Sequence, residues 1–308
     1  MQQWLVKRML AVRATGSCTS VSLRRDLLKH HGIEVDPCTV RRVLQNAGYE
    51  WLPRAQKPRH TADVKRQRKD FANDIVAMTP RQVKAKLALC MDGVVLTMPP
   101  ADTIARENFC LGGETHTWRQ RDEHSLPALA ACDKYRKQVP ENRAVPLWGG
   151  VAAGGFSIIV FHDRRKLTAE EWAEGVEAGK LRSAIQRLSP ARQNGPWTVL
   201  CDNEAFLRAP ASAAAHRADD IHLLKIPPKS PDLNPVELYW SWLRRALLAK
   251  DLEDLKQGRP TLGKTAFKAR VRAICASAKA KRVACACVNN LHKVCKEVLR
   301  LKGAATRF

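Results

Sequence analysis

One stretch of this chain constrains its fold more than any other: a buried strand that ends in two polar residues, followed by a proline-led helix. Residues 197–201, Trp-Thr-Val-Leu-Cys, form an apolar run that stops at Asp202 and Asn203, as a buried strand stops where a polar site begins. Residues 226–237 read Ile-Pro-Pro-Lys-Ser-Pro-Asp-Leu-Asn-Pro-Val-Glu, which predicts a stiff approach to a helix. One carboxylate then closes a strand and another, Glu237, opens a helix.

A third carboxylate, Asp92, lies in the middle of the apolar stretch 86–96. A charged residue inside such a strand is costly unless it is paired or bound to metal. Two or three carboxylates in one site suit Mg²⁺, which needs only one or two of them beside substrate oxygens. We therefore predict that Asp92, Asp202 and Glu237 form one metal site.

Each carboxylate also has a purely structural interpretation. Asn234, Pro235 and Glu237 occupy the positions of an N-cap, an N1 proline and an N3 glutamate, so Glu237 could belong to a capping arrangement. Asp202 and Asn203 could form a turn. The residues alone leave these alternatives open.

At these positions the chain resembles the DDE transposases of the mariner superfamily, which includes Tc and mariner elements and related bacterial insertion sequences. The resemblance rests on the strand-Asp-Asn step, on Ser-Pro-Asp-Leu-Asn-Pro-Val-Glu at 230–237, and on the thirty-four residues, 203–236, between the second Asp and the Glu. It implies an α/β fold: a ribonuclease-H-like mixed sheet with flanking helices, preceded by a small all-α helix-turn-helix module. It implies Asp92, Asp202 and Glu237 as catalytic and metal-binding residues. Many members have an acidic residue directly after the first Asp, where this chain has Gly93.

The same resemblance implies a reaction: cutting and joining of transposon DNA by metal-dependent phosphodiester hydrolysis and strand transfer. Two Mg²⁺ ions, for which Mn²⁺ would substitute, are expected about 3.5–4 Å apart. Asp92 and Asp202 would hold both ions, and Glu237 would complete one of them. Water and then a DNA 3′-hydroxyl would be the nucleophiles, so the protein supplies no nucleophile of its own. We interpret His222 as a strand-edge residue rather than a general base. The expected partners are the transposon ends, the target DNA and a second copy of the chain.

Composition supports a polyanionic partner. The 308-residue chain has 53 Lys and Arg against 30 acidic residues and a formal net charge of +23. Nucleic acid is the leading candidate, while a ribosome-associated or acidic-membrane protein stays open on charge alone. No run of eighteen apolar residues and no secretory signal occurs, so we expect neither a membrane span nor secretion. The expected location is the nucleus in a eukaryote and the cytoplasm otherwise.

Ten cysteines without a paired framework favour a reducing compartment. Cys285, Cys287, His292 and Cys295 could suggest zinc. The surrounding sequence reads as a helix with residues 288, 291, 295 and 298 on one stripe, which favours burial of the thiols.

The N-terminal region predicts a helix-turn-helix. A helix over 20–31 stops at Gly32, and a second begins with Asp36 as N-cap and runs to Ala47. The outer face of the second helix is expected to contact the major groove. Its predicted DNA-binding residues are Thr39, Arg41, Arg42, Gln45 and Asn46. The superfamily has two such modules in tandem, and this one resembles the second; we expect only that one here.

A basic, proline-broken linker follows at 53–60. Arg54, Lys57 and Arg59 are expected to neutralise phosphates, with a solvated connector as the alternative. A helix over 61–78 should expose the cations Lys65, Arg66, Arg68 and Lys69 and bury the apolar residues at 64, 71, 75 and 76.

The rest of the chain predicts a mixed α/β core. Residues 143–150 and 155–161 read as paired antiparallel strands, and 167–188 as one amphipathic helix. The dipeptide Trp118-Arg119 resembles a pair found between the superfamily's early strands. The helix after Glu237 should break at 250–252 and again at 258–260, and 264–301 should be a basic helical region that covers the sheet or lies along DNA. The expected domains are 1–52 (helix-turn-helix), 53–84 (linker and helix), 85–250 (catalytic) and 251–308 (basic helices).

Two other functions remain open from the sequence. One is a transposase-derived DNA-binding protein that no longer cuts, which Gly93 and the single N-terminal module would favour. The other is a ribonuclease or resolvase on the same fold, which accounts for the three acids but not for the helix-turn-helix or residues 230–237.

Overall fold

The structure, a computed structural model, describes residues 1–13, 18–53, 60–112, 116–120, 140–163, 166–189 and 194–306. It divides into two compact units. Unit 1 comprises Met1–Lys57, Pro99–Pro140 and Leu248–Thr261, and unit 2 comprises Pro58–Met98, Glu141–Leu247 and Leu262–Phe308. The predicted domains followed one another along the chain, whereas each unit here is assembled from three segments.

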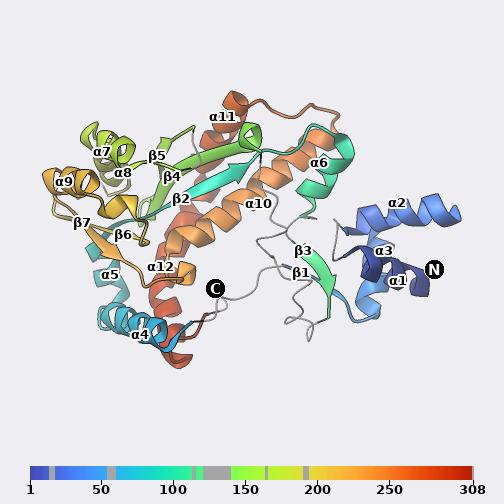
Figure 1. The fold of residues 1–308 in the computed structure, drawn as a ribbon, viewed down its shortest axis with the longest axis horizontal. Helices are drawn as coiled ribbons and strands as arrows, with labels where there is room; N and C mark the ends of the chain where they lie inside the picture. Colours follow the sequence, from blue (N-terminus) through green and yellow to red (C-terminus); the bar gives the residue numbers. More distant parts are fainter. Residues whose placement is uncertain are drawn as a thin grey trace. The chain divides into compact units, whose positions relative to one another are not determined.

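A five-stranded mixed sheet forms the centre of unit 2, in the order β5-β4-β2-β6-β7 (Figure 1). β2 pairs antiparallel with β4 and parallel with β6, and β6 pairs parallel with β7. The fold class predicted from the sequence is confirmed. The strands are β2 (Leu87–Thr97), β4 (Ala144–Ala152), β5 (Gly155–Phe161), β6 (Trp197–Cys201) and β7 (Ile221–Lys225).

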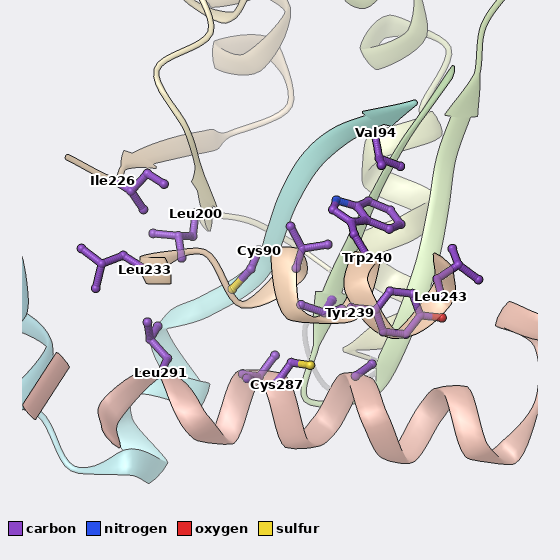
Figure 2. Packing of buried hydrophobic residues seen from close by; sticks show 14 of the residues in the cluster. Cys90, Val94, Leu200, Ile226, Leu233, Tyr239, Trp240, Leu243, Cys287 and Leu291 are labelled. Carbon is purple, nitrogen blue, oxygen red and sulfur yellow. The ribbon is translucent and has the colours of Figure 1, made fainter. Parts of the chain in front are cut away.

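Five helices cover one face of this sheet or lie around its edge. On this face Tyr239, Trp240 and Leu243 of α10 belong to one buried cluster with Cys90 of β2 and Cys287 of α12, and Figure 2 shows α10 between β2 and α12. All five residues are buried, so α10 is held between the sheet and α12. The helices are α4 (Ala62–Val76), α5 (Pro80–Lys86), α10 (Pro235–Lys256), α11 (Lys264–Cys275) and α12 (Ala278–Arg300).

A second apolar core on the opposite face contains α7 (Ala169–Glu177), α8 (Lys180–Leu188) and α9 (Pro210–Ala218). The single helix predicted over 167–188 is wrong. The chain turns at Gly179, whose φ of +72° is a left-handed conformation that side chains disfavour, and two shorter helices result. The apolar stripe was nevertheless located correctly, because its residues are buried on both helices.

Unit 1 contains the predicted pair of short helices. α2 and α3 begin and end as expected: α2 stops at Gly32, and the Asp36 side chain accepts a hydrogen bond from Cys38 N at 2.6 Å. Trp118 of β3 lies opposite Trp51 of β1 and packs in the helical core, so the Trp-Arg dipeptide belongs to this ribbon and not to the central sheet. The elements are α1 (Gln2–Val12), α2 (Ser20–His31), α3 (Pro37–Asn46), β1 (Glu50–Pro53), α6 (Thr103–Cys110) and β3 (His116–Arg119).

The predicted break of the long helix at 250–252 is also wrong, since α10 continues to Lys256. Asp251 is buried and accepts two hydrogen bonds of 2.9 Å from the Arg106 guanidinium of α6. This ion pair compensates the buried Asp251 charge, so the helix continues through the predicted break. The second predicted break, at 258–260, agrees with the end of α10.

Arg68 of α4, expected to be exposed, is fully buried. Its guanidinium donates to both carboxylate oxygens of Asp232 at 2.7 Å and to the carbonyl of Gly303 at 2.9 Å. The backbone N–H and hydroxyl of Thr306 donate to the same carboxylate. α4, the 226–234 segment and the end of the chain are thus joined by one buried network.

No helix in the described ranges is long and apolar enough to cross a membrane.

Removing one partner of the Arg68–Asp232 pair should cost about 3–5 kcal/mol of unfolding free energy, because the other charge stays buried without compensation. We expect this loss for Arg68→Met and for Asp232→Asn, measured by urea unfolding. Lys69→Met, an exposed change on the same helix, is the matched control and should alter stability by less than about 0.5 kcal/mol. Equal stability of the Arg68 and Lys69 variants would contradict this account.

Candidate active site

Three elements of unit 2 bring the predicted carboxylates to one cleft. Asp92 lies within β2, Asp202 directly follows β6, and Glu237 lies in the first turn of α10. β2 and β6 are parallel and Cys90 pairs with Leu200, so Asp92 in the middle of β2 lies level with Asp202 just beyond the end of β6. The cleft has a volume of about 390 Å³. Its other lining residues are Asn203, Glu204, Ala205, Ile226, Pro227, Pro228, Lys229, Ser230, Pro231 and Asn234.

Two asparagines fix the backbone around these carboxylates. The buried side chain of Asn234 donates to the carbonyl of Met91, the residue before Asp92, at 3.2 Å. Asn203 donates to the carbonyl of Ile226 at 2.8 Å, which ties the loop after β6 to the segment after β7. These hydrogen bonds connect all three carboxylate-bearing segments.

Glu237 lines the cleft together with Asp92, and the Asn234 N–H that a capping box would use donates to the carbonyl of Pro231. After burial and the charge of Arg244, an interaction with Asp92 is the next largest influence on the pKa of Glu237. The cap of α10 is a long contact of 3.5 Å from Val236 N to Asn234 Oδ1. The geometry favours a site role for Glu237 over the capping alternative.

Burial and mutual repulsion disfavour negative charge in the cleft. Burial, followed by the charges of Glu237 and Asp202, raises the pKa of Asp92 to about 8. Burial also raises the pKa of Glu237, against the opposing effect of Arg244, and raises that of Asp202. The neighbouring Glu204 has a raised pKa because of burial and the charge of Asp202. Four carboxyl groups therefore gather where a divalent cation would favour their ionised forms.

The donor set fits a hard divalent cation, because every candidate ligand is a carboxylate or amide oxygen. No group of three or more His, Cys, Asp or Glu side chains among the described residues is arranged to hold a metal ion. The three carboxylates thus line the same cleft and affect the pKa values in it, but they do not form a closed coordination sphere.

The cysteine-rich stretch of α12 belongs to the core. Cys287 and Cys295 are buried, and Cys285 contacts the carbonyl of Ala153 at 3.0 Å. Burial raises the pKa of the Cys295 thiol to about 12, which disfavours the thiolate that zinc requires. This geometry favours the burial interpretation.

Gly93, the residue after Asp92, has no space for a side chain, because Trp148 on the neighbouring strand occupies that space. It pairs across the sheet with Trp148, and a Cβ at residue 93 would lie 2.8 Å from the indole. Trp148 itself packs on Trp172 in the second core. An acidic residue at position 93 is therefore sterically incompatible with this core.

The predicted DNA-contacting residues of α3 lie on its outer side. Arg41, Arg42, Gln45 and Asn46 are exposed, and Thr39 is half-buried. The opposite side buries Val40 and Leu44 against the other helices of unit 1. The linker residues Arg54, Lys57 and Arg59 lie outside the described residues.

His222 is exposed on β7, the edge strand, 3.3 Å from Asp220, and it is not among the residues that line the cleft. Sequence reasoning missed the positioning contacts of Asn203 and Asn234 and the fourth carboxyl of Glu204. Glu204 could have been suspected from its place beside Asp202. The contact of Asn234 could not, because its partner lies 143 residues away.

Comparisons with known proteins agree with the resemblance to mariner-like DDE transposases. Residues 134–257 match the family model described as DDE superfamily endonuclease. The fold is similar to a pre-cleavage Mos1 transpososome, with a TM-score of 0.56 and 14% identity, over 100% of this chain and 80% of that one. The Mos1 mariner transposase catalytic domain aligns with a TM-score of 0.56 and 13% identity, over 82% of this chain and 100% of that one. A comparison with curated protein sequences gives no match.

The raised pKa of Asp92 predicts an unusual dependence of stability on pH in metal-free protein. Between the ordinary value of 3.8 and about 8, the folded state binds more protons than the unfolded state. The free energy of unfolding should therefore fall as pH rises through this window, by at most about 1.4 kcal/mol per pH unit for one proton.

Asp92→Asn should remove this slope, so the variant should be more stable than wild type at pH 8 in EDTA and similar at pH 4. Thermal melts across pH would measure it, with the exposed Asp70→Asn as control. In wild type, Mg²⁺ should raise the melting temperature more at pH 8 than at pH 6. Parallel pH profiles for wild type and Asp92→Asn would refute the buried-carboxyl assignment.

Proposed function

We propose that this protein is a DDE transposase that cleaves and joins DNA in a reaction dependent on divalent cations. One observation carries the proposal: Asp92, Asp202 and Glu237, distant in sequence, line one cleft on a ribonuclease-H-like sheet. The match of residues 134–257 to a DDE superfamily endonuclease supports the same chemistry.

Asp92, Asp202 and Glu237 are the residues that would hold the metal. Structures of the Mos1 catalytic domain and of its paired-end complex are described with Mg and with Mn, which supports use of either ion. Bound divalent ions supply activation of the attacking oxygen and stabilisation of the leaving oxygen. The chain's own contribution is to hold the carboxylates at one sheet edge, through Asn203 and Asn234.

The exposed side of α3 would recognise the duplex, and the 54–59 linker would contact its backbone. The side chains that project from α3 are the Arg, Gln and Asn types that read base edges in a major groove. The Mos1 relatives are described as paired-end and strand transfer complexes, which supports a homodimer on two DNA ends and a joining step.

A DNA-binding protein that no longer cuts is the second candidate. It is favoured by the absence, within the described residues, of three side chains arranged to hold a metal ion. The two candidates differ in one measurable property, cleavage of DNA in Mg²⁺ or Mn²⁺.

Asp202→Ala should abolish metal-dependent nicking of the element's own flanking repeats while DNA binding stays nearly intact, because it removes a metal ligand and not a phosphate-binding group. Glu237→Gln should also abolish nicking with little change in melting temperature, since Gln keeps the shape but not the charge. If Glu237 only capped α10, Gln would serve as well at that position and the variant would stay active.

Those variants also separate the two candidates. A wild-type protein that binds the repeats but never nicks them supports the non-cutting candidate. Cleavage by Asp202→Ala at the rate of the wild-type protein would contradict the assignment of the site.

Replacing Arg41 and Arg42 with Ala should weaken DNA binding and reduce its dependence on salt. The slope of log affinity against log salt should fall by about 0.9 for each phosphate that α3 no longer neutralises. Anisotropy titrations over a KCl series measure this, with Lys29→Ala on the exposed side of α2 as a control. An unchanged slope would mean that α3 does not contact DNA.

A further inference from the structure

The outward side of α12 carries a continuous row of exposed residues, most of them cationic. The spacing of three and four residues places them on one side of the helix, opposite its buried apolar stripe. This α12 cation row consists of Lys279, Arg282, Ala286, Asn289, Lys293, Lys296 and Arg300, each of which is exposed.

The charge of the segment that carries this row is strongly unbalanced. Over 264–300 the only acidic residue is Glu297, which pairs with Arg300 at 2.6 Å. The ten cations of the same segment are at positions 264, 268, 270, 272, 279, 281, 282, 293, 296 and 300. A helix that merely faced solvent would have its charges more evenly mixed.

The arrangement also disfavours the helix that carries it. Lys279 and Arg282 lie near the N-terminus of α12, where the helix dipole disfavours cations, and no acidic residue occupies the first turn. Lys293 and Lys296 lie three residues apart, where like charges repel, and the single acidic residue beside them, Glu297, pairs with Arg300. A bound polyanion would relieve both effects.

We propose that the α12 cation row binds the phosphate backbone of double-stranded DNA, as a contact independent of base sequence and additional to that of α3. The row spans 21 residue steps and thus about 32 Å, close to the roughly 34 Å of one turn of B-DNA. The short side chains of Ala286 and Asn289 lie between its two groups of cations and leave room for a duplex to approach.

Other polyanions suit the row less well. A membrane-binding helix inserts an apolar face, but the apolar face of α12 is already buried in the core of unit 2. Single-stranded nucleic acid is held by stacking on aromatic side chains, and the row contains none. The inference depends on the proposed function in one respect, because the proposed action on DNA is what identifies the polyanion as DNA.

The test measures binding of the full chain, in EDTA, to a 30-base-pair duplex unrelated to any transposon end. Anisotropy titrations over a KCl series should give a slope for Arg282→Gln/Lys296→Gln that is lower than that of wild type by about 1.8, because two phosphates are no longer neutralised. The matched control is Lys180→Gln/Arg217→Gln, which removes two exposed cations on α8 and α9 and should leave the slope unchanged.

Substitutions of opposite charge at the exposed Asn289 should change the affinity for DNA in opposite directions. Asn289→Lys should strengthen binding and steepen the slope, whereas Asn289→Glu should weaken it, with melting temperatures close to wild type in both. An unchanged slope for the double variant, or equal affinity of the two Asn289 variants, would overturn the inference. So would a double variant that binds phosphatidylserine vesicles less tightly than wild type but binds the duplex equally well.

These binding results can be distinguished from the outcome of the nicking experiments that test the proposed function. If wild type never nicks DNA but the slope falls in the α12 variants, the backbone contact stands and the nuclease does not. If wild type nicks DNA and the slope is unchanged, the nuclease stands and the row has no DNA contact.

Discussion

The main physical constraint on unit 2 is that several carboxyl groups, contributed by three different segments, share one cleft beside the central sheet. Asp92 is buried in a strand near Glu237 and Asp202, and burial together with their charges disfavours its ionisation. Apolar packing must offset this repulsion in the absence of a cation, and it does so next to the site. Trp240 and Tyr239, which follow Glu237 on α10, are fully buried between the sheet and α12 (Figure 2). The helix that carries one carboxylate is therefore also firmly anchored in the core.

The segment that leads into α10 is fixed by polar contacts and not by regular secondary structure. Asn203 holds its beginning at Ile226, and Asn234 holds its end against β2. Between them Asp232 meets the buried Arg68, which lowers the pKa of the carboxyl below its usual value even though burial opposes this. A network of buried polar groups lowers stability when some of its hydrogen bonds are missing, and it makes the structure rigid when all of them are formed. The completed network keeps the approach to Glu237 in one conformation.

Patterns local in sequence predicted most of this fold, and contacts between distant residues account for the failures. The strands with Asp92 and Asp202, the helix of Glu237 and the caps of α2 and α3 all follow from periodicity and capping residues. Arg68 resembled a solvent-exposed cation because its partner, Asp232, lies 164 residues away. Asp251 resembled a helix end for the same reason, since Arg106 is 145 residues distant. Gly93 could be explained only once Trp148 was known to lie across the sheet from it.

The net charge of +23 likewise acquires meaning only through position. Arg68 and Arg106 add to the total but are buried against carboxylates, so they contribute cohesion and little external field. Arg41 and Arg42, by contrast, lie on the exposed side of α3 with no acidic residue inside that helix. Composition alone therefore predicts a polyanionic partner but cannot locate its surface. Burial distinguishes cations that stabilise the fold from cations on the surface, and in unit 2 α12 presents a row of exposed cations.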